Sequence, residues 1–175
     1  CIRTVHRLDA ATGGVMVFAR SAAAASILSG QVRDHRFRKI YLAVVRGDPG
    51  QGGIWRDMLG RDPVRRVTYI AREPGKDVRP AELDFQRLAS RDGLSLLRIT
   101  LHTGRTHQIR VQFAGRGFPL VGDRKYGGAG DGETLALWAW RLGFTHPETG
   151  RDMVFTHQPP AVWPWTLFPL PETGR

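Results

Sequence analysis

The chain has 175 residues, 41% of them hydrophobic, which suits one globular domain. Lysine and arginine number 26 against 16 acidic residues, so the formal net charge is +10 and nucleic acid is the expected partner. One cysteine excludes an internal disulfide and fits a reducing compartment, and six scattered histidines argue against a metal site. No apolar run approaches the ~18 residues of a membrane span. We expect a cytoplasmic, monomeric protein without a membrane partner.

The first third of the chain predicts a strand, a helix and a second strand. An apolar run over residues 15–19 follows a Gly-Gly pair and predicts a buried strand. Ser21 is a candidate N-cap for a helix over 22–32, because its hydroxyl can accept from an unpaired N–H of the first turn. The second strand is expected over 39–45. The residues expected on the core face of the helix are Ile27, Leu28 and Val32.

The middle of the chain predicts a loop followed by strands. Residues 48–66 are rich in Gly, Asp and Arg and predict a loop excursion. Strands are expected over 65–71, 81–88 and 94–101. An Arg-Asp-Gly turn at 91–93 would join the last two as a hairpin.

The C-terminal part predicts a short helix and two strands. Thr106 can cap the helix, in which Ile109 and Phe113 lie one turn apart and would be buried together. The strands are expected near 135–144 and 151–156, and a proline-rich tail ends the fold.

The order of these elements predicts the fold class. Helices do not alternate regularly with strands, which disfavours a doubly wound parallel sheet and favours an α+β fold with a mixed, largely antiparallel sheet and a few flanking helices. Residues 1–175 contain no internal repeat and no linker, so we expect a single domain.

Polar side chains gather at turns and strand ends in four stretches, 5–14, 39–47, 102–110 and 117–127. In the first, Asp9 stands between a basic tripeptide and the glycine pair, where a turn beside a core strand can hold a reactive side chain rigidly. Taken alone, a surface Asp9 paired with Arg7 is the commoner interpretation. Asp123, after a glycine, is interpreted as a turn or cap residue.

Four motifs in these stretches together resemble the RluA-type RNA pseudouridine synthases, in order and in rough spacing. The motifs are His6-Arg7-Leu8-Asp9-x-x-Thr12-x-Gly14, Lys39-x-Tyr41-x-Ala43-x-x-x-Gly47, Thr103-Gly104-Arg105-Thr106-His107-Gln108-Ile109-Arg110 and Pro119-Leu120-x-Gly122-Asp123-x-x-Tyr126-Gly127. The resemblance implies the pseudouridine synthase fold with a central basic cleft. It also implies an isomerase that detaches the uracil of a uridine in ribosomal or transfer RNA, turns it and rejoins it through carbon, without a cofactor.

The resemblance also implies roles for single residues. Asp9 would be the nucleophile or the electrostatic partner that acts on the nucleoside, Tyr41 would pack on the base and handle its proton, and Arg110 would pair with the carboxylate. Arg7 would occupy the gap left by the flipped base, and Leu120 would line the pocket. The neighbours of Arg110 expected to contact the RNA or to support the loop are Arg105, Thr106, His107 and Gln108.

The chemistry of these residue types agrees with such roles. A carboxylate nucleophile must stay ionised, and a close arginine opposes the rise in pKa that burial causes. A base inside a stem must leave the stack, at a cost of a few kcal/mol. Stacking on an aromatic side chain returns about 1–3 kcal/mol of that cost.

Two other functions stay open at this stage. An inactive relative that only binds RNA would suit the charge equally well. A hydrolase using Asp9 would need a positioned water or a metal cluster, and no second carboxylate stands near Asp9 in a matching motif. Relatives of this type usually carry Ser where this chain has Gly13, and they have a further core strand before the first motif. We therefore expect this chain to lack that strand, and to lack an accessory RNA-binding domain.

Overall fold

The computed structural model describes residues 1–127, 130 and 132–173. An eight-stranded sheet runs in the order β10-β9-β4-β8-β7-β5-β6, with β2 beside β9. Its pairs are antiparallel except β2–β9, which is parallel. The long strands are β4 (Arg38–Arg46), β5 (Gly52–Asp62), β6 (Val67–Ile70), β7 (Arg79–Arg91), β8 (Leu94–Leu101), β9 (Leu137–Thr145) and β10 (Asp152–Thr156). The α+β, mostly antiparallel prediction is confirmed.

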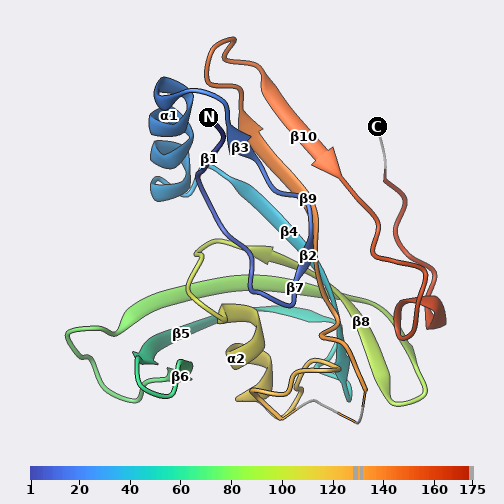
Figure 1. The fold of residues 1–175 in the computed structure, drawn as a ribbon. Helices are drawn as coiled ribbons and strands as arrows, with labels where there is room; N and C mark the ends of the chain where they lie inside the picture. Colours follow the sequence, from blue (N-terminus) through green and yellow to red (C-terminus); the bar gives the residue numbers. More distant parts are fainter. Residues whose placement is uncertain (128–129, 131, 174–175) are drawn as a thin grey trace.

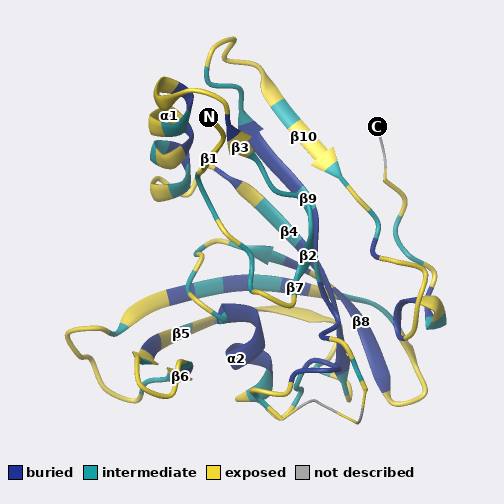
Figure 2. Cartoon of the chain, in the orientation of Figure 1, coloured by how far each residue is buried: buried dark blue, intermediate teal, exposed yellow. Residues whose placement is uncertain are grey.

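Three short strands and three helices complete the chain. They are β1 (Arg3–Thr4), β2 (Gly13–Gly14), β3 (Phe18–Ala19), α1 (Ala22–Arg33), α2 (Gln108–Ala114) and the 3-10 turn η1 (Trp165–Leu167). Figure 1 shows α1 beside β1 and β3 at one end of the sheet, and α2 against the part of the sheet that contains β5 and β7. Figure 2 shows that burial concentrates in β8, β9 and α2. The apolar side chains of α2 thus cover one face of the sheet, and the tail with Trp165 and Phe168 packs on Leu42 and Val44 of the other face.

The predicted strand over 15–19 is wrong as a single element. Gly13 and Gly14 pair with β9, and the Val15 N–H still donates to the Ala139 carbonyl at 2.8 Å. The chain then leaves the main sheet, and only Phe18 and Ala19 form a strand, paired with β1. The apolar run is therefore shared between two sheets, a division that local pattern does not encode.

The glycine pair is required by the close approach of this segment to β9. A Cβ on Gly13 would lie 2.4 Å from the ring of Trp138. A Cβ on Gly14 would lie 2.2 Å from the Ala139 carbonyl oxygen, and Gly14 has a φ of +119°. The Trp138 side chain thus occupies the space that a serine at position 13 would need.

The predicted loop over 48–66 is also wrong, because residues 52–62 form β5. Its Trp55, Asp57 and Leu59 are more buried than the residues between them, as a strand with one packed face requires. Asp57 accepts hydrogen bonds from Gln112 of α2 at 2.7 Å and from Arg116 at 2.9 Å. The polar residues of this segment suggest a loop, but one of them, Asp57, contacts α2.

Helix α1 begins as predicted, since the Ala24 N–H donates to Ser21 Oγ at 3.1 Å. Leu28 is buried, but Ile27 is 47% exposed, so its assignment to the core is wrong. Gln31 takes that place: its amide donates to the Thr145 carbonyl at 2.8 Å and accepts from the Thr145 N–H at 3.0 Å. The buried Gln31 amide pairs with the backbone N–H and carbonyl of Thr145, the last residue of β9, and so fixes the rotation of α1 about its own axis.

Helix α2 begins at Gln108, and the predicted Thr106 cap is wrong. His107 occupies the N-cap position with a φ of +54° and makes no side-chain capping bond. The Thr106 carbonyl instead accepts from Thr68 Oγ1 at 2.8 Å. Ile109 and Phe113 are buried together, as predicted.

The hairpin between β7 and β8 is confirmed. Asp92 and Gly93 have φ values of +52° and +74° at its tip. Positive φ at both central residues is the geometry that matches the twist of the flanking strands.

Candidate active site

A pocket lies where the loop after β1, strand β4 and the start of α2 meet. Asp9 comes from the loop, Tyr41 from β4 and Arg110 from α2, so three separate motifs supply its polar wall. The other lining residues include Arg7, Leu8, Thr12, Lys39, Leu101, Gly104, Arg105, His107, Gln108, Ile109 and Leu137. The three residues that were expected to act on the substrate therefore face one hollow.

Arg110 joins Asp9 to a second, buried carboxylate. Its Nη1 donates to Asp9 Oδ2 at 3.3 Å, while Nε and Nη2 each donate to Asp123 at 2.8 Å. The side chains of Asp9, Arg110 and Asp123 are 21%, 10% and 0% exposed. Burial by itself would lower the pKa of Arg110, but the hydrogen bonds and charges of Asp123 and Asp9 outweigh it and raise that pKa. The guanidinium is therefore a permanent cation beside Asp9.

Asp123 does more than the turn role that its sequence context suggested. Besides the two bonds from Arg110, its Oδ1 accepts from the backbone N–H groups of Lys125 and Tyr126 at 3.1 and 3.2 Å. A fully buried carboxylate needs this much compensation. The Gly-Asp-x-x-Tyr motif was visible in the sequence, but its buried cationic partner was not.

Tyr126 supports Arg110 from another side. The Arg110 guanidinium carbon lies 5.2 Å from the centre of the Tyr126 ring. The Tyr126 hydroxyl accepts from the Thr68 N–H at 2.8 Å and lies 2.8 Å from Nδ1 of His107. Burial lowers the pKa of His107, although the charge of Asp9 acts in the opposite direction. A chain of contacts thus runs from β6 to the pocket wall.

The Tyr41 side chain gives the pocket an aromatic ring and a phenol hydroxyl. It is 9% exposed and belongs to the core cluster that contains Ile109 and Phe113. Burial, and then the charge of Asp9, raise the pKa of Tyr41 well above its usual value. The hydroxyl is therefore protonated at neutral pH and available as a hydrogen-bond donor.

The remaining predicted residues are divided between the rim, the loop and the core. Arg7 is exposed and Arg105 is half-buried, and both line the pocket. Gln108 is buried, and its amide oxygen accepts from Thr103 Oγ1 at 2.8 Å and from the Arg105 N–H at 3.0 Å, so it holds the loop. Thr106 is exposed and does not line the pocket. Leu120 is fully buried beside Tyr41 and lies behind the pocket wall rather than in it.

Lys39 is a pocket residue that the sequence reasoning did not assign. Its place two residues before Tyr41 on β4 was the available signal. No group of three or more His, Cys, Asp or Glu side chains that could hold a metal occurs in the part of the chain that the structure describes. No helix among the described residues is long and apolar enough to cross a membrane.

A family model described as RNA pseudouridylate synthase matches residues 2–115. The chain belongs to the RluA-type RNA pseudouridine synthase family. The match spans the first three motifs and so contains Asp9, Tyr41 and Arg110.

Relatives of this RluA-type chain occur among curated bacterial proteins. An RNA pseudouridine synthase of Chloroflexus aurantiacus is 41% identical over 160 residues, 90% of this chain and 50% of that protein. The ribosomal large subunit pseudouridine synthase D of Nitrosomonas europaea is 34% identical over 161 residues, 86% of this chain and 46% of that protein. The chain thus spans about half the length of these relatives.

Solved structures agree with the assignment to this family. The human RNA pseudouridylate synthase domain containing 1 superposes with a TM-score of 0.81 at 27% identity, covering 93% of this chain and 71% of that one. The human domain containing 4 superposes with a TM-score of 0.78 at 21% identity, covering 95% and 74%, and supports the fold.

Proposed function

We propose that this protein isomerises uridine to pseudouridine in RNA, using Asp9 on a uridine flipped out of its stack. The observation that carries the proposal is the contact of Asp9 with Arg110 inside a pocket that also presents Tyr41. A buried guanidinium keeps a nucleophilic carboxylate ionised at neutral pH. The pocket gives a flipped pyrimidine an aromatic side chain to pack on.

In the proposed reaction the bond between uracil N1 and ribose C1′ breaks, and a bond between uracil C5 and C1′ forms. Asp9 attacks C1′ as the N1–C1′ bond breaks, the detached uracil turns within the pocket, and C5 then displaces Asp9 from C1′ and returns its carboxylate. The proton on C5 is lost and N1 gains one, so atoms and charge balance without a cofactor. Tyr41 packs on the base and is placed to exchange a proton with it, while Arg7 takes the space that the base leaves.

The RNA class is a finer part of the proposal. The Nitrosomonas relative is named for the ribosomal large subunit, which favours ribosomal RNA over transfer RNA. A rice relative is named as chloroplastic, whereas the single cysteine here suits the cytoplasm. A monomer suffices for the proposed site, because one chain supplies Asp9, Tyr41 and Arg110.

The test compares the wild type with Asp9→Asn on ribosomal and transfer RNA transcripts labelled with tritium at uracil C5. We expect the wild type to release tritium and form pseudouridine, detected by nuclease digestion and mass spectrometry. Asp9→Asn should bind the same RNA and form none. Full activity of Asp9→Asn would refute the role of Asp9. If the wild type binds RNA without forming any product, the protein is an inactive RNA-binding relative. Release of free uracil by the wild type would indicate a hydrolase.

A further inference from the structure

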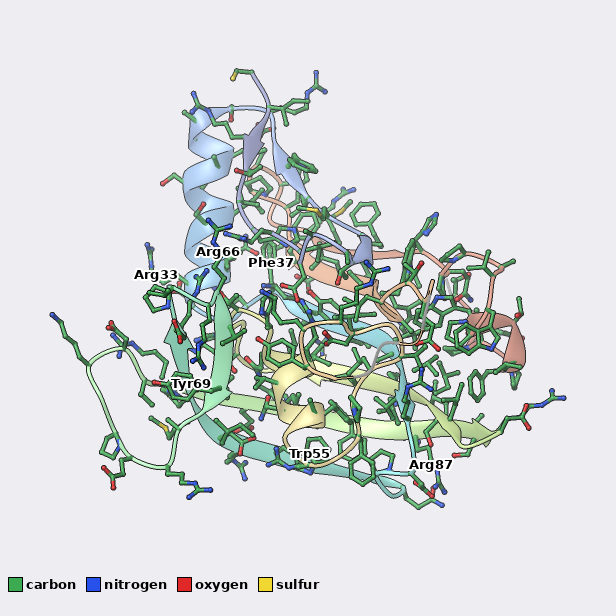
Figure 3. The ribbon with its side chains drawn as sticks, turned by 60° about the horizontal axis from the view of Figure 1, so that its bottom comes forward. Arg33, Phe37, Trp55, Arg66, Tyr69 and Arg87 are labelled. Carbon is green, nitrogen blue, oxygen red and sulfur yellow. The ribbon has the colours of Figure 1, made fainter. Side chains whose placement is uncertain are left out.

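A second groove continues from the active-site pocket toward the C-terminal end of α1. The two hollows share Lys39, Leu101, Gly104 and Arg105, so they form one continuous surface. Beyond the shared residues, the groove is lined by Arg33 at the end of α1 and by His102 after β8. Figure 3 shows Arg33 and Phe37 at that end of α1.

The groove is basic along its whole length. Its lining contains Arg33, Lys39 and Arg105, together with His35 and His102, and no carboxylate among the residues that the structure describes there. The acidic partners of Arg33 and His102 lie outside it. Asp34 pairs with Arg33 at 3.9 Å and with Arg36 at 3.4 Å, and Asp84 pairs with His102 at 2.7 Å. Exposed pairs of this kind are weak, so they leave the groove positive.

Lys39 stands at the junction of the pocket and the groove. Within the described residues its ammonium has no carboxylate at ion-pair distance. Its Nζ lies 5.9 Å from the centroid of the Phe37 ring. Burial lowers the pKa of Lys39. A half-buried cation without a counter-ion is costly for the protein, which points to an anionic ligand.

We propose that Lys39 binds the phosphodiester next to the flipped uridine, and that the groove behind it holds the adjoining nucleotide. This inference rests on the proposed function, since it assigns the neighbours of the uridine. The ammonium serves as a point charge for one phosphate. Arg105 lines both hollows beside Lys39, and Arg33 lies farther along the path that the strand would take; each supplies a planar group that contacts phosphate or stacks on a base. The occupant is therefore single-stranded RNA, bound beside the target base.

The test uses a fluorescently labelled nine-nucleotide RNA with one central uridine. Each phosphate in turn is replaced by an uncharged methylphosphonate, and binding is measured by anisotropy. For the wild type we expect one phosphate beside the uridine to stand out, with a loss of about tenfold in affinity when it is neutralised. In Lys39→Met that loss should vanish, and the slope of log Kd against log salt should fall by about 0.7.

Two matched variants control for folding and for net charge. Lys39→Arg keeps a cation at the junction and should retain the phosphate effect. Lys76→Met removes the same charge from an exposed turn that lines neither hollow, and should retain it as well. A flat phosphate scan, an RNA that does not bind, or a phosphate effect that survives Lys39→Met would overturn the proposal.

Failure of this subsite differs from failure of the proposed activity. If the wild type forms pseudouridine and the phosphate scan is flat, only the subsite is refuted. If the scan shows the Lys39-dependent phosphate and no RNA is isomerised, the subsite stands as an RNA-binding feature and the activity is refuted.

Discussion

Asp123 holds two of the three hydrogen-bonding nitrogens of Arg110 at 2.8 Å each, and the third is directed at Asp9 at 3.3 Å. The completely buried carboxylate therefore fixes the guanidinium plane, and the partly exposed one takes the longer contact. Because Asp123 carries most of the pairing, Asp9 accepts one hydrogen bond from Arg110 and remains open to the pocket.

Asp123→Asn tests this division. It removes the negative charge that holds Arg110 and leaves Asp9 as its remaining carboxylate partner, so Arg110 should shift toward Asp9. We expect a loss of stability of about 3–5 kcal/mol, because a buried ion pair loses one partner. We also expect activity to fall about 10²-fold, since small misplacements at a reacting group are costly. Urea unfolding and pseudouridine formation at a temperature where the variant is folded measure the two effects; unchanged activity in a folded variant would contradict the positioning role.

Tyr126→Phe separates the ring from the hydroxyl. The ring beneath Arg110 stays, but the Thr68 N–H loses its acceptor and His107 loses its contact. We expect a stability cost of about 1–3 kcal/mol from the unsatisfied N–H, and a smaller loss of activity than in Asp123→Asn. Tyr69→Phe, which alters an exposed tyrosine next to Thr68 on β6, is the control. Equal stability of the two variants would show that the Tyr126 hydroxyl contributes nothing.

Because of His6, we expect the stability of the fold to decrease at acidic pH. Burial, and then the charge of Lys39, lower the pKa of His6 from 6.5 to about 4, and its Nε2 accepts from the Val17 N–H at 3.0 Å. Because the folded pKa lies below the unfolded one, the stabilisation is complete above pH 6.5 and is lost as the pH falls toward 4. The loss should reach at most about 3 kcal/mol, less where solvent screens the ring.

Urea unfolding between pH 7 and pH 4 measures this dependence. His6→Gln keeps a hydrogen-bond acceptor without a titrating ring, so its slope over this range should be shallower than that of the wild type. His35→Asn removes an exposed histidine at a position with positive φ, which asparagine tolerates, and should keep the wild-type slope. Identical slopes for His6→Gln and the wild type would rule out His6 as the source.

Gly13 and Trp138 should be coupled. Because a Cβ at position 13 would lie 2.4 Å from the Trp138 ring, Gly13→Ser should destabilise the protein by about 1–3 kcal/mol through overpacking. Trp138→Leu clears that space at a cost of its own, and the double variant should recover part of the Gly13→Ser loss. A double-mutant cycle by thermal unfolding gives the coupling energy, and strictly additive effects would mean that the ring moves aside freely.

Local chemistry in the sequence was sufficient for much of this molecule. The Ser21 cap, the hairpin at Asp92 and Gly93, and strand β4 each depend on residues close together in the chain, so their signals are complete within a short window. The family resemblance brought Asp9, Tyr41 and Arg110 into one expected site, and all three line the same pocket.

Only the tertiary structure decided the rest, because those features depend on partners far away in sequence. The residues of strand β5 were predicted to form a loop, and their Asp57 is paired with the distant Arg116. The burial of Gln31, which the sequence did not indicate, depends on the distant Thr145. Asp123 looked like a turn residue because its buried partner, Arg110, is supplied by a different motif. A buried polar side chain is tolerable only when a distant group satisfies it, and no short window of sequence contains that group.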